Sequence, residues 1–143
     1  MDLITAFYGC LYVGVVPVTI RPPHPQNLQT TLPTVRMIVD VSKSAVVLSS
    51  QQVIKLLKSK EASNVVDIKS WPITLDTDDI SKRKLPGVYR APTAEMLAYL
   101  DFSVSTTGML AGRINNRLTN ILEFKGEKVD DLCVYCCFFL LAL

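Results

Sequence analysis

The chain has 143 residues, of which 49% are hydrophobic and 20% are charged, and its formal net charge at pH 7 is +2. This length suits one domain with a sizeable core. So small a charge, without a dense Lys/Arg block that carries interleaved aromatic residues, excludes the usual profile of a nucleic-acid-binding protein. The sequence therefore predicts a globular domain without a nucleic acid partner.

The four cysteines are unevenly placed, with Cys10 alone and Cys133, Cys136 and Cys137 close together. A small secreted domain would spread its cysteines in a disulfide framework, so reduced thiols in the cytoplasm are the better interpretation. Cys133 and Cys136 have the spacing of half a zinc site, but His24 is the only histidine and a second ligand pair is missing. We therefore assign no metal site, and a redox role for this pair lacks the helix start that such motifs use.

The first 20 residues contain an uncharged run from Leu3 to Ile20 that just reaches the length of a membrane span. Glycine and proline interrupt it, and the basic start of a signal peptide is missing, so we favour a cytoplasmic domain over a membrane anchor. The apolar spacing predicts instead a helix that Asp2 caps, that runs to about Val13 and that Gly14 ends.

A strand is expected directly after that helix, because residues 15–20 are rich in β-branched side chains. Pro17 indicates that this strand lies at a sheet edge or contains a bulge. The turn Arg21–Pro25 is stiff and extended, and His24 within it is expected to be a solvated loop histidine.

The middle of the chain alternates between helical and strand patterns. A second helix is predicted to begin at Thr31 or Thr34, with Pro33 in its first turn. There follow a strand over 44–49, an amphipathic helix over 51–60, strands over 65–68 and 73–75, a surface linker over 85–92 and a buried strand over 96–102. This alternation with short connections favours an α/β domain with a mainly parallel sheet and flanking helices.

The end of the chain has a different pattern. Arg113–Lys128 is polar and has helical spacing at Ile114, Leu118 and Ile121. Leu132–Leu143 is a continuous apolar run that is too short to span a bilayer. A buried strand, an interface segment and an exposed aggregation-prone segment are all compatible with it.

The segment Phe102–Gly112 combines hydroxyl side chains with glycines at the end of a predicted strand. In open α/β folds such a turn binds phosphate groups, because backbone N–H groups and hydroxyls surround the anion. The Gly-Lys-Ser/Thr ending of a Walker loop and the G-x-G-x-x-G pattern are both missing, so an ordinary surface turn is the alternative. The candidate phosphate-binding residues are Ser103, Ser105, Thr106, Thr107, Gly108 and Gly112.

The order and spacing of this segment resemble the phosphate loop of adenylate-forming enzymes, Tyr-Thr-Ser-Gly-Ser-Thr-Gly-x-Pro-Lys-Gly. Among the positions that differ, Ser105 stands for Gly, Leu110 for Pro and Ala111 for Lys. An Ala at the Lys position is typical of fatty acyl-AMP ligases, a branch of that superfamily. Over residues 1–112 the chain further resembles the disco-interacting protein 2 family, on the segments Phe7–Pro25, Thr31–Asp40 and Leu75–Ile80.

The resemblance implies a partial N-terminal subdomain of the AMP-binding fold over residues 1–112, followed by a divergent tail over 113–143. It implies ATP and Mg²⁺ as cofactors, and ATP-dependent adenylation of fatty acids or related carboxylates as the chemistry of full-length members. The loop hydroxyls and glycines named above would hold the β- and γ-phosphates. Ala111 lacks the positive charge that Lys would bring to this loop.

The chain also lacks the family's later segments that bind adenine and ribose, its acidic Mg²⁺ site and its carboxyl-terminal subdomain with a catalytic Lys. We therefore expect an inactive fragment and assign no catalytic residue. The alternatives are a regulatory fragment that associates with itself or with a longer isoform through an exposed sheet edge, and a small membrane-associated protein. The abrupt end of the likeness at Gly112 indicates that the following residues arise from alternative splicing or an unspliced intron.

Overall fold

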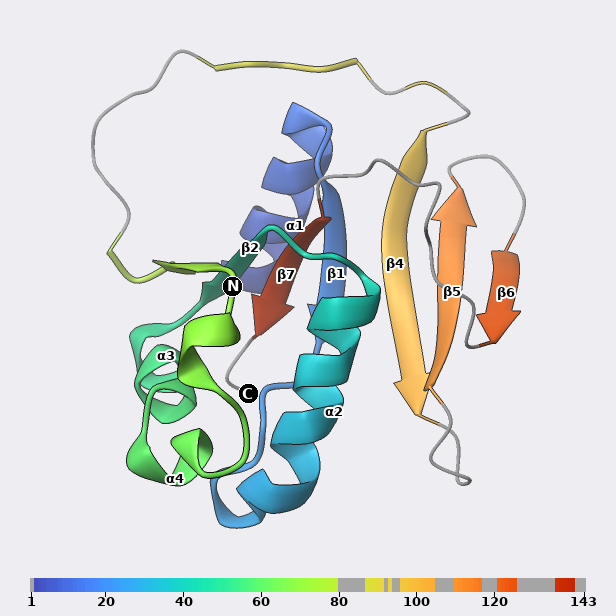
Figure 1. Cartoon of the computed structure of the whole chain (residues 1–143). Helices are drawn as coiled ribbons and strands as arrows, with labels where there is room; N and C mark the ends of the chain where they lie inside the picture. Colours follow the sequence, from blue (N-terminus) through green and yellow to red (C-terminus); the bar gives the residue numbers. More distant parts are fainter. Residues whose placement is uncertain are drawn as a thin grey trace.

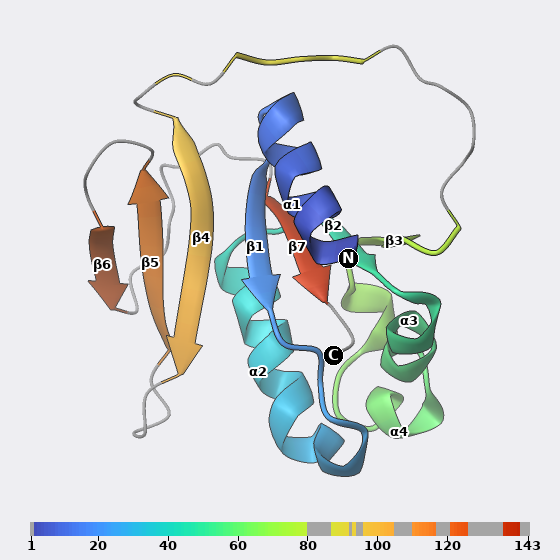
Figure 2. The same ribbon diagram turned by 180° about the vertical axis from the view of Figure 1, so that it is seen from behind.

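The computed structural model describes residues 2–79, 87–91, 93, 96–104, 110–116, 121–125 and 136–140, and beyond Phe102 it defines only the backbone of the strands. Within these residues, seven strands form one sheet with the order β3-β2-β7-β1-β4-β5-β6. Figures 1 and 2 show helix α1 on one face of this sheet and helix α2 on the opposite face. The helices are α1 (Asp2–Val13), α2 (Leu28–Val41), α3 (Gln51–Leu57) and α4 (Lys60–Ser63), with short 3-10 helices at Pro25–Asn27 and Ile68–Ser70. The strands are β1 (Val16–Ile20), β2 (Val46–Ser49), β3 (Ile73–Asp76), β4 (Leu97–Val104), β5 (Leu110–Asn116), β6 (Ile121–Lys125) and β7 (Cys136–Leu140).

The predicted α/β class with parallel strands is confirmed. Strands β3, β2, β7, β1 and β4 run parallel to one another, while β5 is antiparallel to both β4 and β6. The chain leaves β1 through α2 toward β2 on one side, whereas β4 pairs with β1 on the other side. The strand order therefore reverses between β1 and β4, which makes this pair the topological switch point of the sheet.

Helix α1 ends where the sequence predicts. Gly14 has φ of +76°, which glycine adopts without steric cost. The N–H of Val15 donates to the carbonyl of Cys10 at 2.9 Å, and the N–H of Gly14 donates to the carbonyl of Leu11 at 3.4 Å. This pair of bonds is a Schellman motif, which turns the chain directly from α1 into β1.

The core occupies both faces of the sheet because alternate residues of each strand point to opposite faces. Val47 packs in the main cluster with α2, α3 and α4, whereas Val46 and Leu48 pack against Cys10 of α1. Burial on both faces matches the continuous apolar character of these strands. The main cluster consists of Val16, Val18, Leu32, Val35, Ile38, Val39, Val47, Val53, Leu57, Ala62 and Leu100.

The second helix begins earlier than predicted. Helix α2 starts at Leu28, after a 3-10 turn, so Thr31 and Thr34 lie inside it instead of capping it. Pro33 also lies within the helix and is exposed to solvent. Because proline has no backbone N–H, one carbonyl of the preceding turn lacks its helical hydrogen bond, and on the exposed face water can donate to it instead.

Arg36 fixes α2 to the turn before β3. Its guanidinium donates to both carboxylate oxygens of Asp40, to Oδ2 at 3.0 Å, and to the carbonyl oxygen of Ser70 at 2.6 Å. The same group lies over the Trp71 ring, 5.5 Å from its centroid. One side chain thus joins two segments that are far apart in the sequence.

Three further expectations were wrong. The predicted strand Val65–Ile68 is instead a turn that leads into a 3-10 helix. Pro17 is buried in a central strand, between β7 and β4, and not at an edge. It lies before the first β1–β4 pair, Val18 with Leu100, so its missing N–H interrupts no bond to β4.

The end of the chain gives the third correction. The segment expected to be helical over 113–128 contains β5 and β6, which pair with each other. Of the alternatives for the apolar tail, the strand is the one observed, because the β7 backbone lies between β1 and β2. Across the described ranges, no helix is long and apolar enough to cross a membrane.

Candidate functional site

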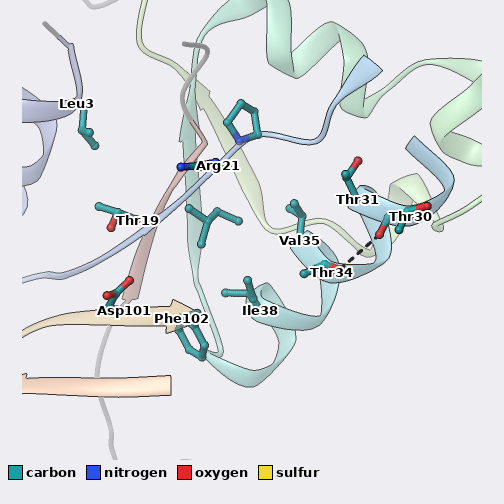
Figure 3. Close-up of a pocket in the computed structure, with 12 residues that line it drawn as sticks. Leu3, Thr19, Arg21, Thr30, Thr31, Thr34, Val35, Ile38, Asp101 and Phe102 are labelled. Carbon is teal, nitrogen blue, oxygen red and sulfur yellow. Dashed lines mark hydrogen bonds between the residues drawn. The ribbon is translucent and has the colours of Figure 1, made fainter. Parts of the chain in front are cut away.

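A pocket of about 670 Å³ lies at the carboxyl ends of β1 and β4 (Figure 3). Its walls come from the first turn of α1, the end of β1 and the turn after it, one side of α2, and β4. This volume is in the range of small-molecule sites. The lining residues are Leu3, Thr19, Ile20, Arg21, Pro22, Thr30, Thr31, Thr34, Val35, Ile38, Asp101 and Phe102.

The strand pairing explains why a pocket forms here. The β1–β4 register comprises two pairs, Val18 with Leu100 and Thr19 with Asp101. Beyond Thr19 the two strands continue without a further registered pair, so a crevice opens between their ends. In open α/β sheets, ligands bind at such a crevice, at the carboxyl edge of the topological switch point. The pocket therefore occupies the place that the topology favours for a ligand.

The polar lining contains one cation and one anion. The guanidinium of Arg21 and the carboxylate of Asp101 are exposed, and among the described residues neither forms a hydrogen bond or an ion pair. The hydroxyl of Thr31 donates to the carbonyl of Asn27, just before α2, at 2.8 Å, and that of Thr34 donates to the carbonyl of Thr30 at 3.4 Å. Arg21 and Asp101 are thus the charged residues of the lining.

The turn after β1 is held by local contacts. His24 has extended dihedral angles, its Nδ1 accepts a hydrogen bond from the N–H of Gln26 at 3.3 Å, and its own N–H donates to Thr31 Oγ1 at 3.1 Å. Pro23 is buried. As predicted, His24 is exposed, and it also caps the short 3-10 helix that precedes α2. These contacts fix the backbone that carries Arg21.

The predicted phosphate-binding residues are only partly within the described structure. Ser103 belongs to β4 and Gly112 belongs to β5, whereas Ser105, Thr106, Thr107 and Gly108 lie outside the described residues. In the antiparallel β4–β5 pair, Ser103 is opposite Ala111 and Phe102 is opposite Gly112. Because Phe102 lines the pocket, the two ends of the predicted segment meet at its rim.

Sequence reasoning missed the pocket residues outside that segment, in particular Arg21, Thr30 and Asp101. A signal for Arg21 was present, because the resemblance to adenylate-forming folds implies that the Pro-Pro turn lies near the substrate cleft. Thr30 and Asp101 had no such signal, since the packing of α2 brings Thr30 to the site and the register of β1 with β4 brings Asp101 there.

The described side chains contain no group of three or more potential metal ligands. Cys133 lies outside the described residues, while Cys136 and Cys137 belong to β7. Cys10 is buried against the α1 face of the sheet. Within the pocket, Asp101 is the carboxylate that a nucleotide-bound Mg²⁺ would meet, and one carboxylate with substrate phosphates is a usual Mg²⁺ environment.

Comparison with known proteins reveals close relatives. Disco-interacting protein 2 homolog A of Homo sapiens is 70% identical over 112 residues, which are 78% of this chain and 7% of that protein. Disco-interacting protein 2 of Drosophila melanogaster is 64% identical over 112 residues, 6% of its length. A medium-chain-fatty-acid acyl-carrier-protein ligase of Moorena producens is 28% identical over 114 residues, 19% of its length. No family profile and no solved structure matches the chain.

The pocket at the switch point of the sheet and the similarity to a fatty-acid ligase support a link to the adenylate-forming ligase-like proteins. Over the aligned 112 residues it belongs to the disco-interacting protein 2 family. The chain spans about 7% of the length of the first of these relatives.

Proposed function

We propose that the chain is part of the N-terminal subdomain of a fatty acyl-AMP ligase-like domain and carries the phosphate-binding side of its ATP site. The observation that supports this is the pocket between β1 and β4, whose rim includes Phe102, the residue before the predicted phosphate-binding hydroxyls. A phosphate loop at the switch point of an α/β sheet is where such folds bind nucleotides.

In this proposal the hydroxyls of Ser103, Ser105, Thr106 and Thr107 donate to the β- and γ-phosphates of Mg-ATP. Gly108 and Gly112 allow the backbone to approach the phosphates. The chemistry of the whole protein would be adenylation of a fatty acid or related carboxylate, in which positioning and charge stabilisation dominate.

The chain by itself is proposed to bind nucleotide weakly and not to turn it over. The aligned 112 residues are 7% of the length of the first relatives, and in this proposal the contacts to adenine and ribose come from other parts of the whole protein. With the phosphate contacts alone, we expect a Kd on the order of 1 mM, equivalent to roughly −4 kcal/mol.

The test is a ³¹P NMR titration of Mg-ATP with the purified chain and two Thr→Ala variants. We expect broadening of the β- and γ-phosphate lines with the wild type, and its loss in Thr107→Ala. Thr93→Ala is the matched control, because Thr93 is exposed and precedes the amino end of β4, away from the pocket. Unchanged lines with the wild type, or equal broadening with Thr107→Ala, would contradict the proposal.

A specific observation also favours the second candidate, self-association through a sheet edge. In the described sheet, β3 is an end strand with β2 as its one neighbour. Its side chains Ile73 and Leu75 are 68% and 49% exposed. An edge strand with exposed apolar residues is a template for pairing, and a second copy of β3 offers the matching backbone groups and side chains.

Sedimentation velocity tests this association. The wild type should form a concentration-dependent dimer, and Leu75→Lys should shift it to monomer, because a charged residue on an edge strand opposes pairing. Thr93→Lys adds the same charge elsewhere and should leave the dimer intact. A wild type that stays monomeric up to about 100 µM, well above typical micromolar affinities, would rule the dimer out.

A further inference from the structure

We propose that Arg21 is the anion-binding cation of the pocket, and that it recognises the polyphosphate of a magnesium-bound ligand. This inference rests on the proposed function and extends it to a residue that lies about 80 positions before the predicted phosphate loop in the sequence. The loop itself lacks a cation, because Ala111 occupies the position where most adenylate-forming enzymes have Lys.

The position of Arg21 is the first argument. It follows the last residue of β1, on the strand that borders β4 at the switch point, and it lines the same pocket as Phe102. Figure 3 shows Arg21 between Thr19 and the α2 side chains that form the opposite wall. A ligand in the crevice therefore passes close to this guanidinium.

The availability of the side chain is the second argument. Arg36, which belongs to α2, already contacts Asp40, Ser70 and Trp71, so its role is structural. The Arg21 guanidinium has no such contacts among the described residues. A guanidinium offers two parallel N–H donors to phosphate oxygens, so it can replace Lys as a phosphate-binding group.

The rigidity of its backbone is the third argument. Arg21 is followed by Pro22 and by the buried Pro23, and His24 ties the turn to Thr31 of α2 through the 3.1 Å hydrogen bond. The proline dihedral angles and this bond restrict the turn before any ligand binds. Binding then costs less conformational entropy than it would on a flexible loop.

The local field adds to the attraction for an anion. Thr30 and Thr31 of the lining belong to the first turn of α2, which contains no acidic residue, and the preceding Asn27 makes no side-chain capping bond. The amino end of a helix carries partial positive charge. The lining also contains the carboxylate of Asp101. A site with one cation and one carboxylate suits a polyphosphate that carries Mg²⁺ better than it suits the free anion.

The test uses inorganic tripolyphosphate and ATP as probes, each with and without Mg²⁺, in ³¹P NMR titrations. The variant is Arg21→Gln, and Arg90→Gln is the matched control, because Arg90 is exposed and its backbone N–H bonds to Tyr12 near the other end of β1. Arg21→Gln should weaken binding of both magnesium complexes about tenfold or more, as expected for loss of a charged hydrogen-bonding group. Arg90→Gln should bind within about twofold of the wild type, and Arg21→Lys should lie between wild type and Arg21→Gln.

The outcomes separate this inference from the proposed function. If Mg-ATP binds equally to the wild type and Arg21→Gln, the role of Arg21 is overturned while the nucleotide site stands. If tripolyphosphate binds in an Arg21-dependent manner but ATP does not bind, the nucleotide site fails and the role of Arg21 stands. If neither probe binds to the wild type, both are overturned. If Arg21→Gln does not fold, the comparison of Arg21→Lys with the wild type decides. An unchanged affinity of Arg21→Lys for the magnesium complexes would contradict bidentate recognition by Arg21.

Discussion

Phe102 of β4 and Gly112 of β5 lie directly opposite each other in the antiparallel pair. Pairing continues beyond them to Val104 with Leu110, and the two ends of the predicted phosphate-binding segment therefore lie side by side at the rim of the pocket. A side chain at position 112 would share a sheet face with Phe102, because opposite residues of an antiparallel pair have Cβ atoms about 4.5–5.5 Å apart.

We predict that Gly112→Val weakens Mg-ATP binding by about tenfold, equivalent to roughly 1.4 kcal/mol, because its branched side chain crowds the rim of the site. Gly87→Val is the control, since Gly87 is exposed and a Cβ there would meet no described atom within 4 Å. Valine suits a strand at position 112 and an exposed segment at position 87, so urea unfolding should change by less than about 1 kcal/mol in both variants. Equal nucleotide affinity in the two variants would argue against a site at this rim.

Arg36→Ala should lower the free energy of unfolding by about 1–2 kcal/mol. It removes a bidentate contact to Asp40, a bond to the Ser70 carbonyl and the contact with the Trp71 ring. The single tryptophan of the chain reports unfolding in urea by its fluorescence. Asp40→Ala should cost less than Arg36→Ala, because Asp40 is exposed and makes one of these three contacts. An equal loss in both variants would mean that the ion pair alone carries the effect.

Alanine substitution of Gly9, inside α1, and of Gly14, directly after it, should change the free energy of unfolding in opposite directions. At Gly14, a Cβ would lie 2.6 Å from Cδ of Arg90 and would face a φ of +76°, so Gly14→Ala should destabilise by about 1–2 kcal/mol. At Gly9, inside α1, a Cβ would meet no described atom within 4 Å. Gly9→Ala should therefore stabilise by about 0.5–1 kcal/mol through helix propensity. Thermal unfolding of the two variants checks both signs, and a stabilising Gly14→Ala would show that α1 does not end in this motif.

Local patterns were sufficient for most of the elements up to β4. Gly14 marks the end of α1, β-branched residues mark β1, and the i, i+3, i+4 spacing of Val35, Ile38 and Val39 marks the buried face of α2. The start of α2 was missed because Asn27 makes no side-chain cap and no acidic residue follows it. A helix of this kind begins where its apolar face begins to pack, which a capping pattern does not record.

Long-range pairing was not predictable from the same patterns. The spacing of Ile114, Leu118 and Ile121 suits a helix, yet Ile114 belongs to β5 and Ile121 to β6, and these two strands pair with each other. The place of β7 between β1 and β2 depends on strands about 90–120 residues earlier in the chain. Arg21 and Asp101 line the same pocket because of the β1–β4 register, which no local motif encodes.

The most direct test of the nucleotide site is a thermal melt of the purified chain with and without Mg-ATP. At about 10 mM Mg-ATP and a Kd near 1 mM, mass action predicts about 1.4 kcal/mol of stabilisation, which is a rise in Tm of roughly 3–6 °C. Mg-AMP at the same concentration, which lacks the β- and γ-phosphates, should give a smaller rise. A cooperative transition that Mg-ATP does not move, or the lack of a cooperative transition, would contradict a folded nucleotide site in this chain.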